Sequence, residues 1–158
     1  MTPTDFGDMN CSVARALGEV GERWSLLIVR EAIMGSTRFD EFHQRLGVAR
    51  NILTRRLETL VAAGVLQRLA SEHNARIFIY QLTEKGWDLY PVVAALMHWG
   101  DRWIDAGAGP PVVLVDRKTG EPIPRVTLRT ERGQAIARAD IAIRPGAGAT
   151  QRTRARLG

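Results

Sequence analysis

Four polar side chains of the kinds that contact DNA lie within one short stretch of the sequence. They are Arg50, Asn51, Thr54 and Arg55. Arginine can donate two hydrogen bonds to guanine, asparagine pairs in the same way with adenine, and threonine can meet a base, a methyl group or a phosphate. The stretch therefore offers the chemistry of base readout and phosphate contact at one place in the chain.

An amphipathic helix over residues 49–62 is predicted to carry these side chains. At about 100° per residue, the apolar residues Leu53, Leu57 and Leu60 fall on one stripe, which is typical of a helix packed on a core. The four polar residues lie opposite this stripe or at the N-terminal edge, the end by which a recognition helix enters a major groove. Arg56 lies beside the stripe, and we expect it to stabilise the fold instead of contacting DNA.

The expected partner of Arg56 is a carboxylate of the preceding segment, Asp40 or Glu41. Exposed helix faces are commonly charged, and arginine is a good helix former. The helix alone therefore leaves open whether Arg50 and Arg55 meet DNA or only solvent. The elements on either side favour DNA.

The order of elements around this helix is that of a winged helix-turn-helix. Apolar residues recur at spacings of three and four over residues 11–35, which predicts two helices, and over 37–47, which predicts a short one. Residues 65–70 and 76–83 look like strands. Residues 84–106 look like a long helix, with Thr83 as its expected N-cap and a bend expected at Pro91 near its start. A short helix, a tight turn, a second helix and a hairpin place one helix in a major groove. The predicted fold class is mainly α, with a small β component (α+β).

The hairpin over residues 65–82 is the predicted wing. At its turn lie His73, Asn74 and Arg76. A wing arginine can follow the phosphates or enter the minor groove, where negative potential is concentrated. Arg38 lies at the start of the short helix, where a first helix crosses the DNA backbone. We expect Arg38 and Arg76 to contact DNA, with His73 and Asn74 as further candidates.

Charge and composition limit the other functions. The 158 residues carry a net charge of +5, with seven basic and four acidic side chains in residues 35–80 and eight and two in residues 125–158. No apolar run approaches the roughly 18 residues that cross a bilayer, and the first residues do not resemble a signal peptide. We expect a cytoplasmic protein with no membrane partner. The single cysteine excludes an internal disulfide and a cysteine-rich zinc site.

Composition divides the chain into three regions. Residues 1–106 form the predicted DNA-binding and dimerisation domain, and a glycine- and proline-rich linker follows them. Residues 107–144 form a small β-rich extension with an expected hairpin that turns at "TGEP". Residues 145–158 have the composition of a disordered basic tail.

With these features the chain resembles the HxlR-type family of bacterial winged-helix transcriptional regulators, which is MarR-like. The resemblance covers about Cys11 to Trp103 and rests on motifs that include "ILTRRLETLVAAGVLQR", "YQLTEKG" and "LYPVVAALMHWGDRW". It implies a homodimer, built from the N-terminal and long C-terminal helices, on a palindromic double-stranded DNA operator. It also implies that "RNILTRR" is the recognition helix and Ser71 to Arg76 the wing tip. The residues expected at the dimer interface are Trp24, Leu96, Trp99 and Trp103.

Cys11 is the candidate site for an effector. It lies at the start of the first predicted helix, and helix N-termini lower the pKa of a thiol. Several members of the family are described as thiol-based sensors, which suggests redox sensing, whereas a small packing residue at the dimer interface is the alternative. The tryptophans could also form a pocket for a small molecule, although helical spacing favours core and dimer packing. We expect no metal, no cofactor and no enzymatic activity.

Sequence-specific regulation by a homodimer on an inverted-repeat operator is therefore the favoured function. One alternative is a non-specific or architectural DNA binder whose affinity comes from the basic tail. The other is a winged-helix module that binds protein instead of DNA, which the fold allows.

Overall fold

The computed structural model describes residues 6, 9–71, 74–104, 107 and 109–157; the side chains of residues 75 and 76 lie outside the described part. These residues form two compact units, Met1–Tyr90 with Arg144–Gly158, and Pro91–Ile143. No helix in the described ranges is long and apolar enough to cross a membrane.

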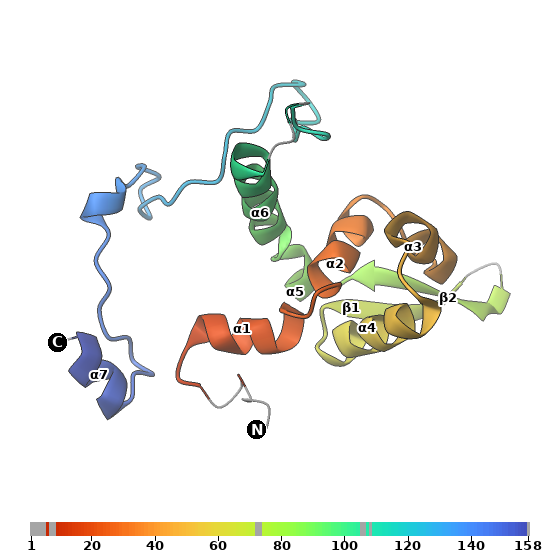
Figure 1. The fold of residues 1–158 in the computed structure, drawn as a ribbon, viewed down its shortest axis with the longest axis horizontal. Helices are drawn as coiled ribbons and strands as arrows, with labels where there is room; N and C mark the ends of the chain where they lie inside the picture. The colour runs from red at the N-terminus through yellow and green to blue at the C-terminus, as the bar shows by residue number, and fades with distance from the viewer. Residues whose placement is uncertain (1–5, 7–8, 72–73, 105–106, 108, 158) are drawn as a thin grey trace. The chain divides into compact units, whose positions relative to one another are not determined.

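The first unit contains a small antiparallel sheet and most of the helices. In chain order the elements are α1 (Ser12–Val20), α2 (Ser25–Ile33), α3 (Phe39–Leu46), α4 (Arg50–Ala62), β1 (Leu66–Ser71), β2 (Asn74–Leu82), α5 (Glu84–Trp87) and α7 (Gln151–Leu157). Strand β1 contacts α4 and strand β2 contacts α3, while α2 contacts α3, α4 and β2 (Figure 1). This mixture of helices and a two-stranded sheet is consistent with the predicted winged helix-turn-helix.

The turn between α3 and α4 is as short as the sequence indicates. Helix α3 ends at Leu46, and its C-cap is Gly47, whose φ of 61° lies in the left-handed region that glycine adopts without strain. Val48 is buried, and Ala49 is the N-cap of α4. The predicted stripe of Leu53, Leu57 and Leu60 is confirmed, because all three side chains are fully buried. Among the described residues, Ile28, Val29, Phe42, Val65 and Leu66 are also fully buried.

The wing is a hairpin in which Leu66 pairs with Leu82 and Ala70 with Phe78, with an irregularity between Ala70 and Ser71. The backbone before α3 extends the sheet, because Arg38 forms a bridge with Ile79 and the Tyr80 N–H donates to the Thr37 carbonyl at 2.7 Å. The start of α3 is thereby joined to the second wing strand.

The long helix predicted over residues 84–106 is divided. Thr83 caps α5 as expected, since its hydroxyl accepts from the Gly86 N–H at 3.1 Å. Helix α5 ends at Trp87, and α6 runs from Tyr90 to Trp103. Pro91 explains the break, because it has no N–H to donate to the carbonyl four residues earlier, which is that of Trp87.

The second unit contains α6 and the extension. Where a β-hairpin is expected, the described residues 109–143 form only isolated bridges, Val115 with Pro122 and Arg129 with Ala135, and a short 3-10 helix, η2 (Arg138–Asp140). The Asp116 carboxylate stabilises the turn between Val115 and Pro122, because it accepts from the backbone N–H groups of Lys118 and Thr119. Both N–H groups lower the pKa of Asp116.

The C-terminal residues differ from the predicted disordered tail, because Gln151–Leu157 form α7. The Thr150 hydroxyl accepts from the Thr153 N–H at 3.2 Å, in the manner of an N-cap. Asn10 accepts from the Thr150 N–H and the Thr153 hydroxyl, so the start of α7 is bonded to the residue before Cys11.

Candidate DNA-binding surface

The exposed face of α4 carries the predicted base-reading side chains. They are Arg50, Asn51, Thr54 and Arg55, all exposed. The buried leucine stripe lies on the other side of the helix and fixes which way this face points. The Thr54 hydroxyl donates to the Arg50 carbonyl at 2.9 Å, so its lone pairs and methyl group remain available. The structure thus brings the four residues together on one helix surface.

Among the contacts of the described residues, Arg50 is the member of this group that the neighbouring helix α3 also holds. Its Nη2 donates to the Oδ1 atom of Asp40 at 3.0 Å, and its guanidinium carbon lies 4.8 Å from the centre of the Phe39 ring. The side chain of Arg55, by contrast, makes no hydrogen bond or ion pair within the described ranges.

Arg56 has a different environment from its neighbours, as its position beside the leucine stripe suggests. Only 16% of its side chain is exposed, and its Nη2 lies 2.9 Å from the Oε2 atom of Glu22, in the connection between α1 and α2. The prediction that Arg56 pairs with Asp40 or Glu41 is wrong. Asp40 pairs with Arg50, and Glu41 accepts from backbone N–H groups at the start of α3.

Arg38 is exposed at the N-cap of α3 and next to the wing. Its N–H and that of Thr37 donate to the Glu41 carboxylate at 2.9 and 2.7 Å. The N–H of Arg38 and, to a smaller extent, that of Thr37 lower the pKa of Glu41 below its usual value. The capping interaction orders the backbone at the position where we expect a phosphate contact.

The wing residues are only partly described. Asn74 is exposed at the start of β2 and pairs with Ser71. His73 and the side chain of Arg76 lie outside the described residues. The predicted contacts of the wing tip with DNA therefore remain predictions.

Two wing residues that the sequence analysis did not select, Arg68 and Phe78, contact each other on the hairpin. The Arg68 guanidinium carbon lies 4.2 Å from the centre of the Phe78 ring, which is 43% exposed. A cleft of about 290 Å³ lies between the start of α3 and β2; its lining residues are Arg38, Phe39, Asp40, Ile77, Phe78 and Tyr80. Strand alternation could have indicated that Arg68 and Phe78 share a face, but the register was needed to place them together.

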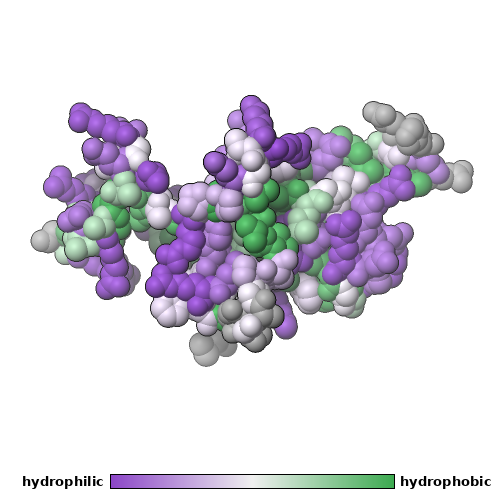
Figure 2. Space-filling view, turned by 90° about the horizontal axis from the view of Figure 1, so that it is seen from above, coloured by the Kyte–Doolittle hydropathy of each residue, from purple (hydrophilic) through white to green (hydrophobic). Residues whose placement is uncertain are grey.

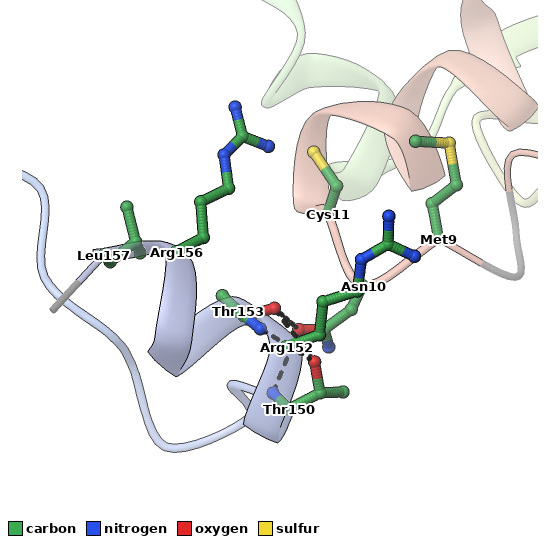
Figure 3. A pocket seen from close by; sticks show the side chains of 8 residues that line it. All are labelled: Met9, Asn10, Cys11, Thr150, Arg152, Thr153, Arg156 and Leu157. Carbon is green, nitrogen blue, oxygen red and sulfur yellow. Dashed lines mark hydrogen bonds between the residues drawn. The ribbon is translucent and has the colours of Figure 1, made fainter.

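Cys11 is exposed and is the N-cap of α1. The backbone N–H groups of Ala14 and Val13 lower the pKa of its thiol, and the charges of Arg15 and Arg156 act in the same direction. The thiol lines a cleft of about 580 Å³ between the start of α1 and α7, and Arg156 extends from α7 on the side where the thiol lies (Figure 3).

The residues predicted at a dimer interface differ in exposure. Trp24 is half-buried, whereas Leu96, Trp99 and Trp103 are 50%, 56% and 65% exposed. With Val92, these three have the spacing of one face of α6. Figure 2 shows one face of the molecule, on which hydrophobic residues reach the surface between hydrophilic ones. Such a row of exposed apolar residues is typical of an interaction face.

Comparison with known proteins points to the same kind of function. Residues 19–108 match the model of the HxlR-like helix-turn-helix family. The chain is 39% identical over 137 residues to the uncharacterized HTH-type transcriptional regulator Rv3095 of Mycobacterium tuberculosis, covering 87% of each protein. It is 33% identical to the regulator YvaP of Bacillus subtilis, covering 58% of this chain and 85% of that protein.

Two solved structures are also similar. The crystal structure of PA1607, which is described as a transcription factor, has 40% identity and a TM-score of 0.82, covering 89% of this chain and 98% of that one. The reduced form of the redox regulator HypR has 30% identity and a TM-score of 0.55, covering 60% of this chain and 95% of that one.

Proposed function

The chain belongs to the HxlR-like helix-turn-helix family and is a transcriptional regulator of the helix-turn-helix type; we propose that it acts as a homodimer on an inverted-repeat operator. The observation that carries this proposal is the polar face of α4. Its arginines and asparagine are exposed at the N-terminal half of a helix whose opposite side is buried.

In the proposed complex α4 enters the major groove by its N-terminal end. Arg50 and Asn51 are placed to donate to base edges, while Thr54 and Arg55 meet a base or the adjoining phosphates. Arg38 binds the backbone beside the groove.

The wing follows the backbone in the same complex. Arg76 is the proposed main contact of the hairpin, and His73 and Asn74 are further candidates. Wing residues of this type act through the phosphates and the width of the minor groove.

The exposed face of α6 supports a dimer. Leu96, Trp99 and Trp103 would be covered by the second copy, with Trp24 contributing from the connection before α2. A two-fold dimer presents its two recognition helices to successive major grooves roughly 34 Å apart. The operator would therefore be an inverted repeat with half-sites one turn of DNA apart.

A thiol response at Cys11 is a second candidate property of the same regulator. It is favoured by the lowered pKa of this exposed thiol, and HypR, a similar protein of known structure, is described as a redox regulator. A thiolate is the form that reacts with oxidants and electrophiles. If Cys11 is only a packing residue, replacing it with Ser will leave operator affinity under oxidant unchanged.

Selection of bound fragments from the source genome, with purified full-length protein at a stated salt concentration, tests the function. We expect enrichment of fragments that share an inverted repeat with half-site centres about 10 base pairs apart. Fragments retained without any common sequence would instead indicate a non-specific binder. Retention of no DNA would indicate a protein-interaction module.

A further inference from the structure

We propose that Asp40 and Phe39, at the start of α3, hold the guanidinium of Arg50 and thereby set the base preference of that arginine. The inference rests on the proposed function, because it concerns the same DNA-binding surface. Asp40 and Phe39 are positioning residues here, since they act on DNA through Arg50.

The geometry gives Arg50 two contacts of different kinds. Asp40 Oδ1 accepts from Nη2 at 3.0 Å. The Phe39 ring lies 4.8 Å from the guanidinium carbon, within the roughly 6 Å over which a cation is attracted to an aromatic ring. One contact limits the rotation of the side chain and the other limits its position, so Arg50 is held in one orientation.

Stability does not explain this arrangement. The side chains of Arg50 and Asp40 are 63% and 82% exposed. Ion pairs between exposed side chains contribute little to the free energy of folding, because water screens the charges and both side chains lose rotamer freedom. Ordering of a ligand-binding side chain before the ligand arrives, however, lowers the entropic cost of binding. The pair is therefore better suited to recognition than to folding.

The contact with Asp40 leaves Arg50 able to read a base. A guanidinium has five N–H donors, and Asp40 accepts from Nη2 alone. Readout of guanine needs two parallel donors directed at O6 and N7, which the other atoms can provide. Phe39 contributes a ring face, which attracts the cation and accepts no conventional hydrogen bond from its N–H groups.

The carboxylate also discourages a less specific use of this arginine. A phosphate brought to Arg50 would lie close to Asp40, and two like charges repel at short range. A guanine edge carries no net charge and is not opposed in this way. Arg55, whose side chain makes no ion pair within the described ranges, is free to bind either. The neighbours of Arg50 and Arg55 thus favour different DNA contacts for these two arginines.

A double-mutant cycle with the full-length protein tests the proposal. The dissociation constant is measured for the selected operator and for operators with single base-pair changes, using wild type, Asp40→Asn, Arg50→Ala and the double variant. Arg55→Ala, alone and with Asp40→Asn, is the matched control. Asp40→Asn keeps the size of the side chain and removes its charge.

We expect Arg50→Ala to reduce discrimination at one base pair by about 5- to 150-fold. Asp40→Asn should reduce discrimination at the same base pair by about two- to tenfold. In the Arg50→Ala background Asp40→Asn should have no further effect, whereas in the Arg55→Ala background its effect should persist. Phe39→Leu, which retains an apolar side chain and removes the ring, should weaken discrimination at the same base pair.

The proposal is overturned if Asp40→Asn leaves discrimination unchanged, or if it acts equally with and without Arg50. It is also overturned if Asp40→Asn changes binding to every sequence by the same factor. Uniform strengthening is what the loss of a negative charge near DNA would produce, and uniform weakening is what a folding defect would produce, which thermal unfolding of the same sample identifies. If Arg50→Ala itself leaves discrimination intact at every position, base readout by Arg50 fails too. An effect of Arg50→Ala without coupling to Asp40 overturns only the positioning role.

Discussion

The Nη2 atom of Arg56 on α4 lies 2.9 Å from the Oε2 atom of Glu22, which precedes α2. Arg56 is largely buried, while Arg55, its neighbour in the sequence, is exposed. Adjacent arginines on one helix therefore have separate roles. Arg56 links α4 to the segment between α1 and α2, and Arg55 is exposed.

Arg56→Ala should lower the free energy of unfolding by about 1–2 kcal/mol, because it removes both the ion pair and the packing of the aliphatic stem. Arg55→Ala should change it by less than about 0.5 kcal/mol, as exposed substitutions do. Urea denaturation of both variants at pH 7 makes the comparison. Equal losses for the two variants would contradict the structural role of Arg56.

Glu41→Gln should destabilise the protein at neutral pH by about 0.5–2 kcal/mol, because Glu41 caps the backbone N–H groups of Thr37 and Arg38. The folded-state pKa of Glu41 is lowered, so its contribution is present above the usual carboxyl pKa and is lost as the pH falls through the folded value. The difference between wild type and Glu41→Gln should therefore shrink with acidification below about pH 4.5.

Denaturation curves between pH 3 and pH 7 measure this difference. Glu58→Gln, an exposed change on α4, is the control, and it should show little difference from wild type at any pH. A difference for Glu41→Gln that stayed constant across the acid range would mean that the charged carboxylate is not the stabilising group.

Gly86→Ala should destabilise the protein, whereas Gly100→Ala should not. A Cβ at Gly86 would lie 2.2 Å from the Val65 carbonyl oxygen, a backbone atom, whereas a Cβ at Gly100 on α6 would meet nothing within 4 Å. Gly86→Ala should cost about 1–3 kcal/mol, and Gly100→Ala should be neutral or stabilise by up to about 1 kcal/mol through better helix propensity. Thermal unfolding distinguishes the two, and a gain of stability in Gly86→Ala would show that the contact relaxes easily.

The sequence predicts most of the elements that position the candidate site. The leucine spacing defines α4, and Gly47 defines the turn before it, because both depend on local periodicity and backbone conformation. The Thr83 cap and the wing hairpin follow from similar local signals. These features needed no knowledge of distant contacts.

Tertiary pairing could not be predicted in the same way. The helical spacing of the leucines predicts that Arg56 lies at the edge of the core. Its ion pair with Glu22, and not with Asp40, depends on how the loop before α2 packs against α4. The contact between Arg50 and Asp40 depends likewise on the angle between α3 and α4. Pro91 was visible as a bend, but the complete separation of α5 from α6 depends on how the freed carbonyl of Trp87 is accommodated.

The thiol of Cys11 should react faster with iodoacetamide at neutral pH than an unperturbed thiol does. Cys11 is the only cysteine, so labelling of the whole chain reports on this residue alone. Its pKa is lowered by the N–H groups of Ala14 and Val13, and the midpoint of the rate against pH should lie below 9.0 in the folded protein. The same chain in urea is the matched control and should have the higher midpoint. Identical midpoints would remove the basis for a reactive thiol.

One measurement tests most directly whether α4 reads DNA sequence. It is the ratio of the dissociation constants for the selected operator and for a scrambled duplex, at one stated salt concentration. Wild type should bind the operator about 10³-fold or more tightly than the scrambled duplex. Arg50→Ala or Asn51→Ala should reduce this ratio by about 5- to 150-fold through loss of preference at one base pair, while Arg38→Ala should weaken both duplexes alike. A wild-type ratio near one, or equal weakening of both duplexes by Arg50→Ala and Asn51→Ala, would contradict sequence readout by α4.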